Sequence, residues 1–435
     1  MTKSYDIIIA GAGSAGFVAA VQAGRLGKKV LLCEKNGMPG GILTVGGNND
    51  IAQFWAHNKQ VIAGIGWEYV KRLESIGGAQ IPDMLVPNKP HWYYGVHVNI
   101  PLAAHLMDEM LLEAGVELRY EQTLCDVETE PDGDMKRIAA VRLTSKSGLE
   151  TLSAKTYIDC TGDGDLSVFA GADYECGTPD EQGLSLQPGT VRAYLNSSNL
   201  TDEQCAKIDA ALAEAIADGS LEPTDTMRRS WKSLVNSRYN NINHISRKNG
   251  ADSREKTEAD IEGRRCVARI IAAVRRTGVD PDFITIAPET AMRETRRIKC
   301  DGYVTADDYV AARRYPDGIC NSFYPIDLHR DGMGGIQQVF LTDGQVPSIP
   351  LSALTVSGIS NLYVAGRCAS GDRLANSAYR VKASCMAMGQ AAGAAAALAC
   401  GNRGSGGHLG NTRGIDFEKL KAILAEHGAI LPKDD

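Results

Sequence analysis

Six consecutive residues near the start of the sequence, Gly11 to Gly16, have the types and spacing that bind a diphosphate. Gly11 permits a tight turn, Gly13 lets the backbone approach a pyrophosphate, and Gly16 lets a helix pack closely on a strand. The unpaired N–H groups at the start of the following helix attract the anion. Glu34 ends the next apolar run, where its carboxylate can accept hydrogen bonds from ribose hydroxyls and disfavour a 2′-phosphate. These residues predict a dinucleotide site that excludes NADP.

A βαβ unit must position this glycine turn. Residues 5–10 and 29–33 are apolar runs typical of buried strands, and the Ala-rich segment 14–25 between them is typical of a helix. The turn lies where the first strand passes into the helix, as the phosphate-binding geometry requires. The pattern therefore predicts an α/β fold that begins with a Rossmann-like parallel sheet. A glycine-rich turn in a nucleotide-free α/β fold is the alternative interpretation.

The rest of the chain predicts a discontinuous first domain with an inserted second one. Apolar runs at 123–127, 137–144 and 151–158, separated by turns, predict a β-meander laid on the sheet. Charged helices at 201–217 and 254–277, with a strand at 291–298, predict an α+β substrate domain. A strand at 361–366 and an Ala/Gly-rich helix at 381–400 then return to the first domain, and Gly389 and Gly393 are expected to contact the sheet or a cofactor. The predicted domains are 1–187 with 346–400, interrupted by an insertion at 45–98; a substrate domain at 188–345; and a linker with a helix at 401–435.

Composition limits the class of protein. The 435 residues are 43% hydrophobic and 23% charged, which suits two or three structural units with a substantial core. A net charge of -7 without a basic block argues against nucleic-acid partners. Eleven cysteines without a C-x-x-C pair indicate neither a disulfide framework nor a metal site, and favour a reducing compartment. We expect a cytoplasmic protein without a membrane span, with a small-molecule substrate as its partner; homo-oligomer formation stays open.

Four separated motifs together resemble one family. They are Thr-Gly-Asp-Gly-Asp at 161–165, Arg-x-x-Arg-Arg-Ile at 293–298, Pro-Ile-Asp-x-His at 325–329 and Ala-Gly-Arg-Cys at 365–368. With the N-terminal unit, their order resembles the FAD-dependent oxidoreductases of the glutathione-reductase-like superfamily over nearly the whole chain. The resemblance implies FAD as the cofactor. It implies as cofactor-binding residues Gly11, Gly13, Ser14, Ala15, Gly16, Glu34, Lys35, Gly40, Gly41, Val127, Thr161, Gly162, Asp165, Gly366 and Arg367.

The resemblance also implies a reaction class: hydride transfer between a small polar substrate and the flavin, with an unidentified electron acceptor or donor. The sequence lacks a C-x-x-x-x-C pair after Glu34, which argues against a disulfide reductase, and lacks a second G-x-G-x-x-G for a separate nicotinamide nucleotide. Two alternatives stay open. One is a binding protein that keeps the cofactor fold without redox turnover, and the other is a flavoprotein related to thiazole synthases or RNA-modifying enzymes.

His329 is the first candidate for catalysis, because the resemblance places its segment beside the flavin and an imidazole can accept the substrate's proton. A merely hydrogen-bonded or exposed histidine is the alternative. Tyr324 and His97 are the next candidates. Arg380 precedes the helix expected near the flavin, where a fixed cation would stabilise the reduced anionic form. Cys368 is interpreted as a small residue under the cofactor, with a covalent tether or redox thiol as the alternative.

Arginines at 293, 296 and 297 offer anion recognition. If residues 291–298 form a strand, Arg293 and Arg297 share one face, and Arg296 lies on the other. We expect one face to bind a substrate carboxylate through Arg293, while the other pairs with acids such as Glu294. A purely structural ion-pair network is the alternative.

Overall fold

The computed structural model describes residues 3–87, 89–180, 183–196, 200–236, 243–279 and 282–433. Its largest element is a seven-stranded sheet with the order β8-β2-β1-β11-β10-β9, in which β22 also pairs with β11. The strands β8 (Glu117–Arg119), β2 (Val30–Cys33), β1 (Lys3–Ala10), β11 (Gly148–Asp159) and β22 (Leu362–Val364) run parallel. The antiparallel edge is β10 (Met135–Ser145) and β9 (Thr123–Asp132). The predicted α/β class with a Rossmann-like sheet is confirmed.

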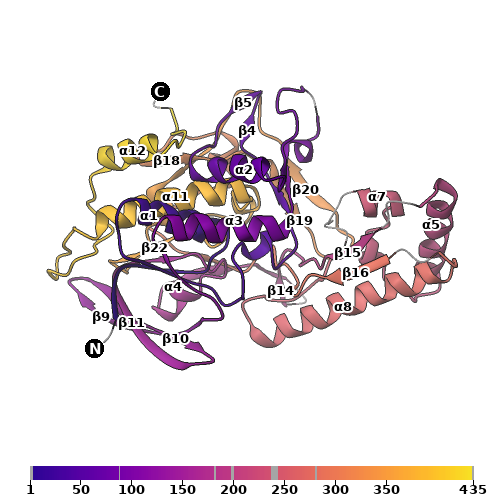
Figure 1. Cartoon of the computed structure of the whole chain (residues 1–435), viewed down its shortest axis with the longest axis horizontal. Helices are drawn as coiled ribbons and strands as arrows, with labels where there is room; N and C mark the ends of the chain where they lie inside the picture. The colour runs from indigo at the N-terminus through magenta and orange to yellow at the C-terminus, as the bar shows by residue number, and fades with distance from the viewer. Residues whose placement is uncertain are drawn as a thin grey trace.

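Both faces of the sheet are buried, as the continuous apolar runs predict. Ile7 and Ile9 of β1 belong to the core on one face, with the helices, whereas Ile8 belongs to the core on the other. The helix layer consists of α1 (Ser14–Arg25), α3 (Ile100–Glu113) and α11 (Lys382–Ala399), as Figure 1 shows. Asn99 caps α3, because its side chain accepts a hydrogen bond from the Leu102 N–H.

The meander differs from the prediction. Its third strand and the strand expected at 156–160 are one continuous strand, β11, which pairs with β1 along one edge. On its other edge, β11 pairs first with β10 and then with β22. The meander therefore extends the sheet and does not lie on it. The extra length of β11 allows this arrangement, because different parts of one strand edge can hydrogen-bond to different neighbours.

Helices α1 and α11 are in backbone contact. A Cβ atom added at Gly389 would lie 2.1 Å from the Ala15 carbonyl oxygen, and one added at Gly393 would lie 2.4 Å from the Ala19 oxygen. The two glycines, one helical turn apart, thus let α11 approach α1 more closely than any side chain would permit. The two glycines were expected to contact the sheet or a cofactor; the atoms that a side chain at either position would meet first belong instead to the main chain of α1.

Residues 45–98 form a small layer beside the helices. It contains β3 (Asp50–Ile51), β4 (Trp55–Ala56), β5 (Lys59–Gln60), α2 (Ile65–Ser75), β6 (Ala79–Gln80) and β7 (Val96–Val98). Its apolar side chains, including Phe54, Tyr69 and Val96, join the helix-side core. The segment is therefore packed on the main body.

A separate lobe projects to one side in Figure 1 and holds its own core. Helices α5 (Asp202–Ala217), α7 (Trp231–Asn236) and α8 (Ser253–Arg275) surround this core, with the short helix α6 (Pro223–Thr226) beside them. Thr201 and Gln204 form a capping box at the start of α5. The strands β15 (Ala193–Asn196) and β16 (Asp282–Ile286) join the lobe to the body.

The segment after the lobe returns to the main core before residue 345. Val304, Tyr309 and Ile319 all lie in the helix-side core with α11. The elements here are β17 (Arg296–Ile298), α9 (Ala306–Val310), β18 (Gly318–Asn321), β19 (Ile326–His329), β20 (Ile336–Val339) and β21 (Ser348–Pro350). The chain ends with α10 (Arg373–Tyr379), α11 and α12 (Phe417–Glu426). The domain boundaries stay a prediction.

The contact between α1 and α11 can be tested with Gly389→Ala. The added methyl group would collide with the main chain of α1, so the helices must separate, at a cost of about 1–3 kcal/mol in the free energy of unfolding. Gly401→Ala is the matched control, because its Cβ would lie 3.8 Å from the nearest atom. We expect thermal unfolding of the Gly389 variant to occur at a lower temperature than that of the control. Equal unfolding temperatures would contradict the close contact.

Candidate cofactor and substrate site

One cavity of ≈ 1110 Å³ runs from the glycine turn to the hairpin of β19 and β20. This exceeds the range of about 300–1,000 Å³ found for ordinary ligand pockets, so it has room for an extended cofactor and a small substrate. The cavity collects segments that are far apart in the sequence: the ends of β1, β2 and β11, the 45–98 layer, the start of α11 and the β19 hairpin. Its wall includes these predicted residues: Gly11, Gly13, Ser14, Ala15, Glu34, Lys35, Gly40, Gly41, Thr161, Gly162, Arg293, Tyr324, His329, Gly366, Arg367 and Arg380.

The glycine turn has the geometry that its spacing predicts. Gly11 has a φ of 93°, and a Cβ there would lie 2.5 Å from the Cys160 carbonyl oxygen, so only glycine suits the turn. A Cβ at Gly16 would lie 1.9 Å from the Gly11 oxygen. Gly13 differs, because a Cβ there would meet nothing within 4 Å. Gly11 and Gly16 therefore serve backbone packing, while Gly13 keeps the cavity wall open for a ligand.

Glu34 braces the turn as well as lining the cavity. Its Oε2 atom accepts the Ala12 N–H at 2.8 Å, and its Oε1 atom accepts the main-chain and side-chain N–H groups of Asn36. A carboxylate can accept about four hydrogen bonds, so capacity remains for a ribose hydroxyl. Gly40 donates its N–H to the Ala12 carbonyl, which brings the loop at 40–41 against the same turn.

Two helices begin at this cavity without a side-chain cap. Gly13 precedes α1 and Val381 precedes α11, and neither residue supplies a capping hydrogen bond. Each helix thus directs the positive end of its dipole toward the cavity, an arrangement that suits anionic groups, although at α11 the Ala383 N–H already donates to the Ala52 carbonyl. Gly366, with a φ of 97°, lies between them, because its Cβ would be 3.2 Å from the Ala15 methyl group.

The motif Thr161–Asp165 forms an ion-paired support. Asp163 accepts hydrogen bonds from Arg367 at 2.7 Å and from the Thr295 hydroxyl at 2.8 Å. Asp165 pairs with Arg296 at 2.9 Å, and it lies outside the cavity wall. Burial, reinforced by the neighbouring carboxylate of Asp163, raises the pKa of Asp165 to about 6. Arg367 is therefore fixed by a carboxylate at the edge of the cavity.

His329 belongs to a row of hydrogen-bonding groups. His244 Nδ1 lies 3.1 Å from the Gly332 carbonyl oxygen, His244 Nε2 lies 3.2 Å from His329 Nδ1, and His329 Nε2 lies 3.3 Å from Asp327 Oδ2. The Gly332 oxygen only accepts, so His244 carries its proton on Nδ1, and its Nε2 must accept from His329. The lone pair of His329 Nε2 then faces Asp327. Three contacts need three protons and two neutral imidazoles supply two, so the row has one place for an additional proton.

Electrostatics keep this place empty in the resting protein. Burial, followed by the nearby charge of Arg293, lowers the pKa of His329 to about 3. Burial and the same arginine lower the pKa of His244 to about 4. Burial opposes the ionisation of Asp327, but the charge of Arg380 and the hydrogen bond from Gln338 help to hold its pKa below the usual range. The result is a carboxylate next to a neutral imidazole.

Arg293 and Arg380 lie in the cavity wall near this row. Arg293 donates to the Pro188 carbonyl, and Arg380 donates to the Gln187 Oε1 atom at 3.0 Å. Burial, followed by the charge of Arg380, lowers the pKa of Arg293 to about 9. Burial also lowers the pKa of Arg380. The protein therefore holds two guanidinium groups close together under conditions that disfavour their charge.

The prediction for the other arginines is correct in that Arg296 pairs with an acid, and wrong about the strand and about Glu294 as that acid. Only Arg296–Ile298 is strand, so the alternation does not extend back to Arg293. Glu294 pairs with Arg297 and Arg373, both at 2.8 Å, whereas Arg296 pairs with Asp165. Arg297 is thus part of a buried ion-pair network, and of the three arginines at 293, 296 and 297, Arg293 is the one in the cavity wall.

Some predicted residues are not brought to the cavity. Val127 lies in β9, at the far edge of the sheet, and packs in the opposite core. Cys368 is fully buried in that core, where burial raises its thiol pKa well above the usual value.

The other two candidates lie in the cavity wall. Tyr324 makes an edge-type ring contact with His91, with ring centroids 4.9 Å apart, and burial raises its pKa so that the hydroxyl stays protonated. His97 is also in the wall, 3.7 Å from Asp50.

Sequence reasoning missed three residues of the wall or its support. Lys382 begins α11 and donates to the Asp50 carbonyl at 2.8 Å, and burial lowers its pKa to about 7. A lone lysine opening an Ala-rich helix is a signal that could have identified it. His244 and Gln187 lie in segments without periodicity, so no local pattern marks them.

The open Gly13, the two uncapped helix starts and the remaining capacity of Glu34 fit the phosphates and ribose of a dinucleotide. The fold and this site define an FAD-binding oxidoreductase of the Rossmann type. Residues 6–424 match the family described as FAD dependent oxidoreductase, and the chain belongs to that family. It is therefore an oxidoreductase with FAD as its cofactor.

The chain is also similar to individual proteins. It is 38% identical to dihydrolipoyl dehydrogenase of Corynebacterium glutamicum over 68 residues, which cover 14% of each chain. Among solved structures, BexE is 14% identical with a TM-score of 0.42, and the match covers 91% of this chain and 61% of BexE. THI4 of Thermovibrio ammonificans is 18% identical with a TM-score of 0.29, covering 41% of this chain and 67% of THI4.

In the part of the chain that the structure describes, none of the helices combines the length and apolar character needed to cross a bilayer.

Gly13→Val tests the phosphate assignment. The added side chain would enter the cavity without meeting protein atoms, so we expect a folded protein that purifies colourless. The control is Gly401→Val, on the exposed turn after α11, which should stay yellow. The measurements are the flavin absorbance per chain and the circular dichroism spectrum. Full flavin occupancy in the Gly13 variant would show that the phosphates bind elsewhere.

Proposed function

We propose that this oxidoreductase transfers a hydride between a carbon atom of a small polar substrate and N5 of FAD, while the His329–Asp327 pair takes up or returns the accompanying proton. Bound FAD supplies the two-electron acceptor or donor. The observation that carries the proposal is the row from Gly332 to Asp327, which has two protons for three contacts. The electron partner that regenerates the cofactor is unidentified.

The row of hydrogen-bonding groups from Gly332 to Asp327 explains how His329, although weakly basic, can act as the proton acceptor. In the oxidation direction, the substrate O–H or N–H bond breaks as hydride leaves the adjacent carbon, and its proton enters between His329 Nε2 and Asp327. The negative carboxylate stabilises the imidazolium that forms, while His244 fixes the other nitrogen as a donor. His244 is therefore a positioning residue. Its fixed tautomer keeps the accepting lone pair of His329 toward Asp327 and prevents the imidazole from turning.

Other wall residues hold and shield the substrate. Tyr324, kept protonated by burial, can donate a hydrogen bond without losing its proton. Trp92 and Tyr93 from the 45–98 layer also lie in the cavity wall. Their rings reduce the water around the reacting atoms, which strengthens the electrostatic interactions there.

A screen for substrates under anaerobic conditions tests the proposal, with loss of the oxidised flavin absorbance as the signal. Once a substrate is found, we expect His329→Ala to remain yellow and to slow flavin reduction by about 10² to 10⁴, the usual contribution of a general base. Because the His329 pKa is lowered to about 3, its accepting form persists above that pH. This histidine should therefore cause no fall in the wild-type rate between pH 8 and 5.

His105→Ala is the control for this experiment, since His105 is an exposed residue of α3. Stopped-flow reduction within a few-fold of wild type for the His329 variant would remove this histidine from the mechanism. A His329-dependent loss of rate near pH 6.5 would also contradict the account, because it would mean that the imidazole titrates at its ordinary pKa.

A further inference from the structure

Two arginines in the cavity wall, the buried Arg293 and the partly buried Arg380, lack a carboxylate partner. Among the described residues, neither Arg293 nor Arg380 forms an ion pair, whereas Arg367 in the same wall pairs with Asp163, and Arg296 and Arg297 behind it are also paired with carboxylates. Arg293 is only 6% exposed, and its hydrogen-bond acceptor is the neutral Pro188 carbonyl. A buried charge without a counter-charge is costly, so such an arrangement points to a ligand that completes it.

Three buried donors at this place have no acceptor. They are Arg293 Nη2, Arg380 Nε and Gln187 Nε2. Gln187 is 1% exposed. Its Oε1 atom accepts hydrogen bonds from the Arg380 guanidinium at 3.0 Å and from the main-chain N–H of His329 at 3.3 Å. The two donors fix the amide orientation, so its NH₂ group must be the free end. Positive charge and unmatched N–H groups therefore occur together, which is the chemistry of an oxyanion site.

The nearest carboxylate does not satisfy this charge. Asp327 accepts hydrogen bonds from Gln338 at 3.2 Å and lies 3.3 Å from His329 Nε2. The hydrogen bond from Arg380 to Asp327 goes to the main-chain carbonyl of Asp327, at 3.5 Å, and not to its carboxylate. Because both histidines are neutral, the negative charge of Asp327 balances only one of the two arginine charges, and the environment of this cluster stays positive. The same cluster adjoins the place where we propose that the proton is taken up.

We propose that Arg293 and Arg380, with the Gln187 amide, bind a carboxylate group of the substrate, so that the substrate class is a small organic acid. This inference rests on the proposed function for the location of the reacting carbon, but not for the anion site itself. A planar guanidinium matches the two oxygens of a carboxylate with parallel hydrogen bonds. The phosphates of FAD have their own site at Gly13 and the first turn of α1, at the other end of the cavity.

The site also connects substrate binding to proton uptake. The charges of Arg293 and Arg380 oppose protonation of His329. A bound carboxylate neutralises part of this field, so the histidine becomes a better proton acceptor only when an acid occupies the site. Neutral compounds of the same size would leave the field unchanged. The arginines thus discriminate between substrates by binding and by the state of the base.

The experiment is calorimetric titration of the FAD-loaded protein with acetate, malonate and succinate, together with succinamide as a neutral analogue and inorganic phosphate as a different oxyanion. The flavin difference spectrum is recorded in parallel. We expect at least one carboxylate to bind and perturb the spectrum, and succinamide to have no effect. Arg293→Gln should keep its FAD and bind that carboxylate about 10- to 100-fold more weakly, because a charge-assisted double hydrogen bond is lost.

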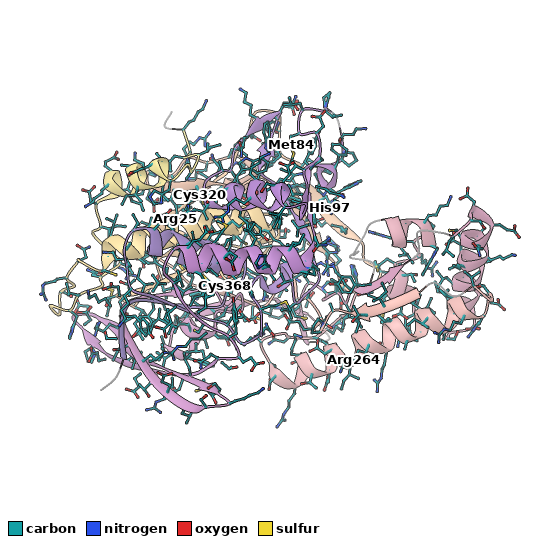
Figure 2. The ribbon with its side chains drawn as sticks, in the orientation of Figure 1. Arg25, Met84, His97, Arg264, Cys320 and Cys368 are labelled. Atoms are coloured by element: carbon teal, nitrogen blue, oxygen red, sulfur yellow. The ribbon has the colours of Figure 1, made fainter. Side chains whose placement is uncertain are left out.

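Arg264→Gln is the matched control, since this arginine lies on the exposed outer side of α8 (Figure 2), and its affinity should equal that of wild type. Arg293→Lys keeps the charge without the fork geometry and should bind with intermediate affinity, which provides a second folded variant if the glutamine variant is unstable. The proposal is overturned if no carboxylate binds, if Arg293→Gln binds as tightly as wild type, if phosphate binds more tightly than every carboxylate, or if either Arg293 variant loses FAD. A protein that contains FAD but binds no carboxylate refutes only this inference, whereas failure of any substrate to reduce the flavin bears on the proposed function.

Discussion

The backbone contact between α1 and α11 is the constraint on which the site depends. Carbonyl groups of Ala15 and Ala19 lie where side chains at Gly389 and Gly393 would otherwise be. This contact brings two helices from opposite ends of the sequence side by side, as Figure 1 shows, and both begin at the same cavity. The glycine turn before α1 and the start of α11, with Arg380 just before it and Lys382 as its first residue, are consequently held in a fixed relation. The proposed cofactor site and the proposed substrate site are therefore neighbours because of one packing interaction.

The cavity divides into two electrostatic regions. At the glycine turn, main-chain N–H groups and helix dipoles supply the positive potential, and the side-chain charges there, such as Arg367, are paired. At the β19 hairpin, the positive charge comes from arginine side chains without carboxylate partners, next to neutral histidines. A cofactor that is bound in every catalytic cycle suits the first region, because its anion is matched by fixed dipoles. A substrate that enters and leaves suits the second, because its charge changes the state of the base.

The sequence allowed the sheet, the glycine turn and part of the cavity wall to be predicted, because the sheet and the turn depend on local patterns and the wall residues belong to recognisable motifs. Apolar runs and glycine spacing report strand burial and turns directly, and the family motifs placed His329 and Gly366 at one site. The features of the site that the sequence did not predict depend on contacts between residues that are far apart in the sequence. The pairing of Arg297 with Glu294, the place of Val127 at the sheet edge and the approach of His244 to His329 follow from tertiary packing. No alternation or spacing within a segment determines which arginine is left without a partner.

A crystal structure of the FAD-loaded protein with a bound carboxylate, such as malonate, tests the central claim most directly. The account predicts the pyrophosphate at Gly13 and the first turn of α1, the flavin between Gly366 and the start of α11, and carboxylate oxygens on the guanidinium groups of Arg293 and Arg380. An Arg293 side chain bound to the cofactor's own phosphates, or a flavin distant from the His329–Asp327 pair, would contradict it.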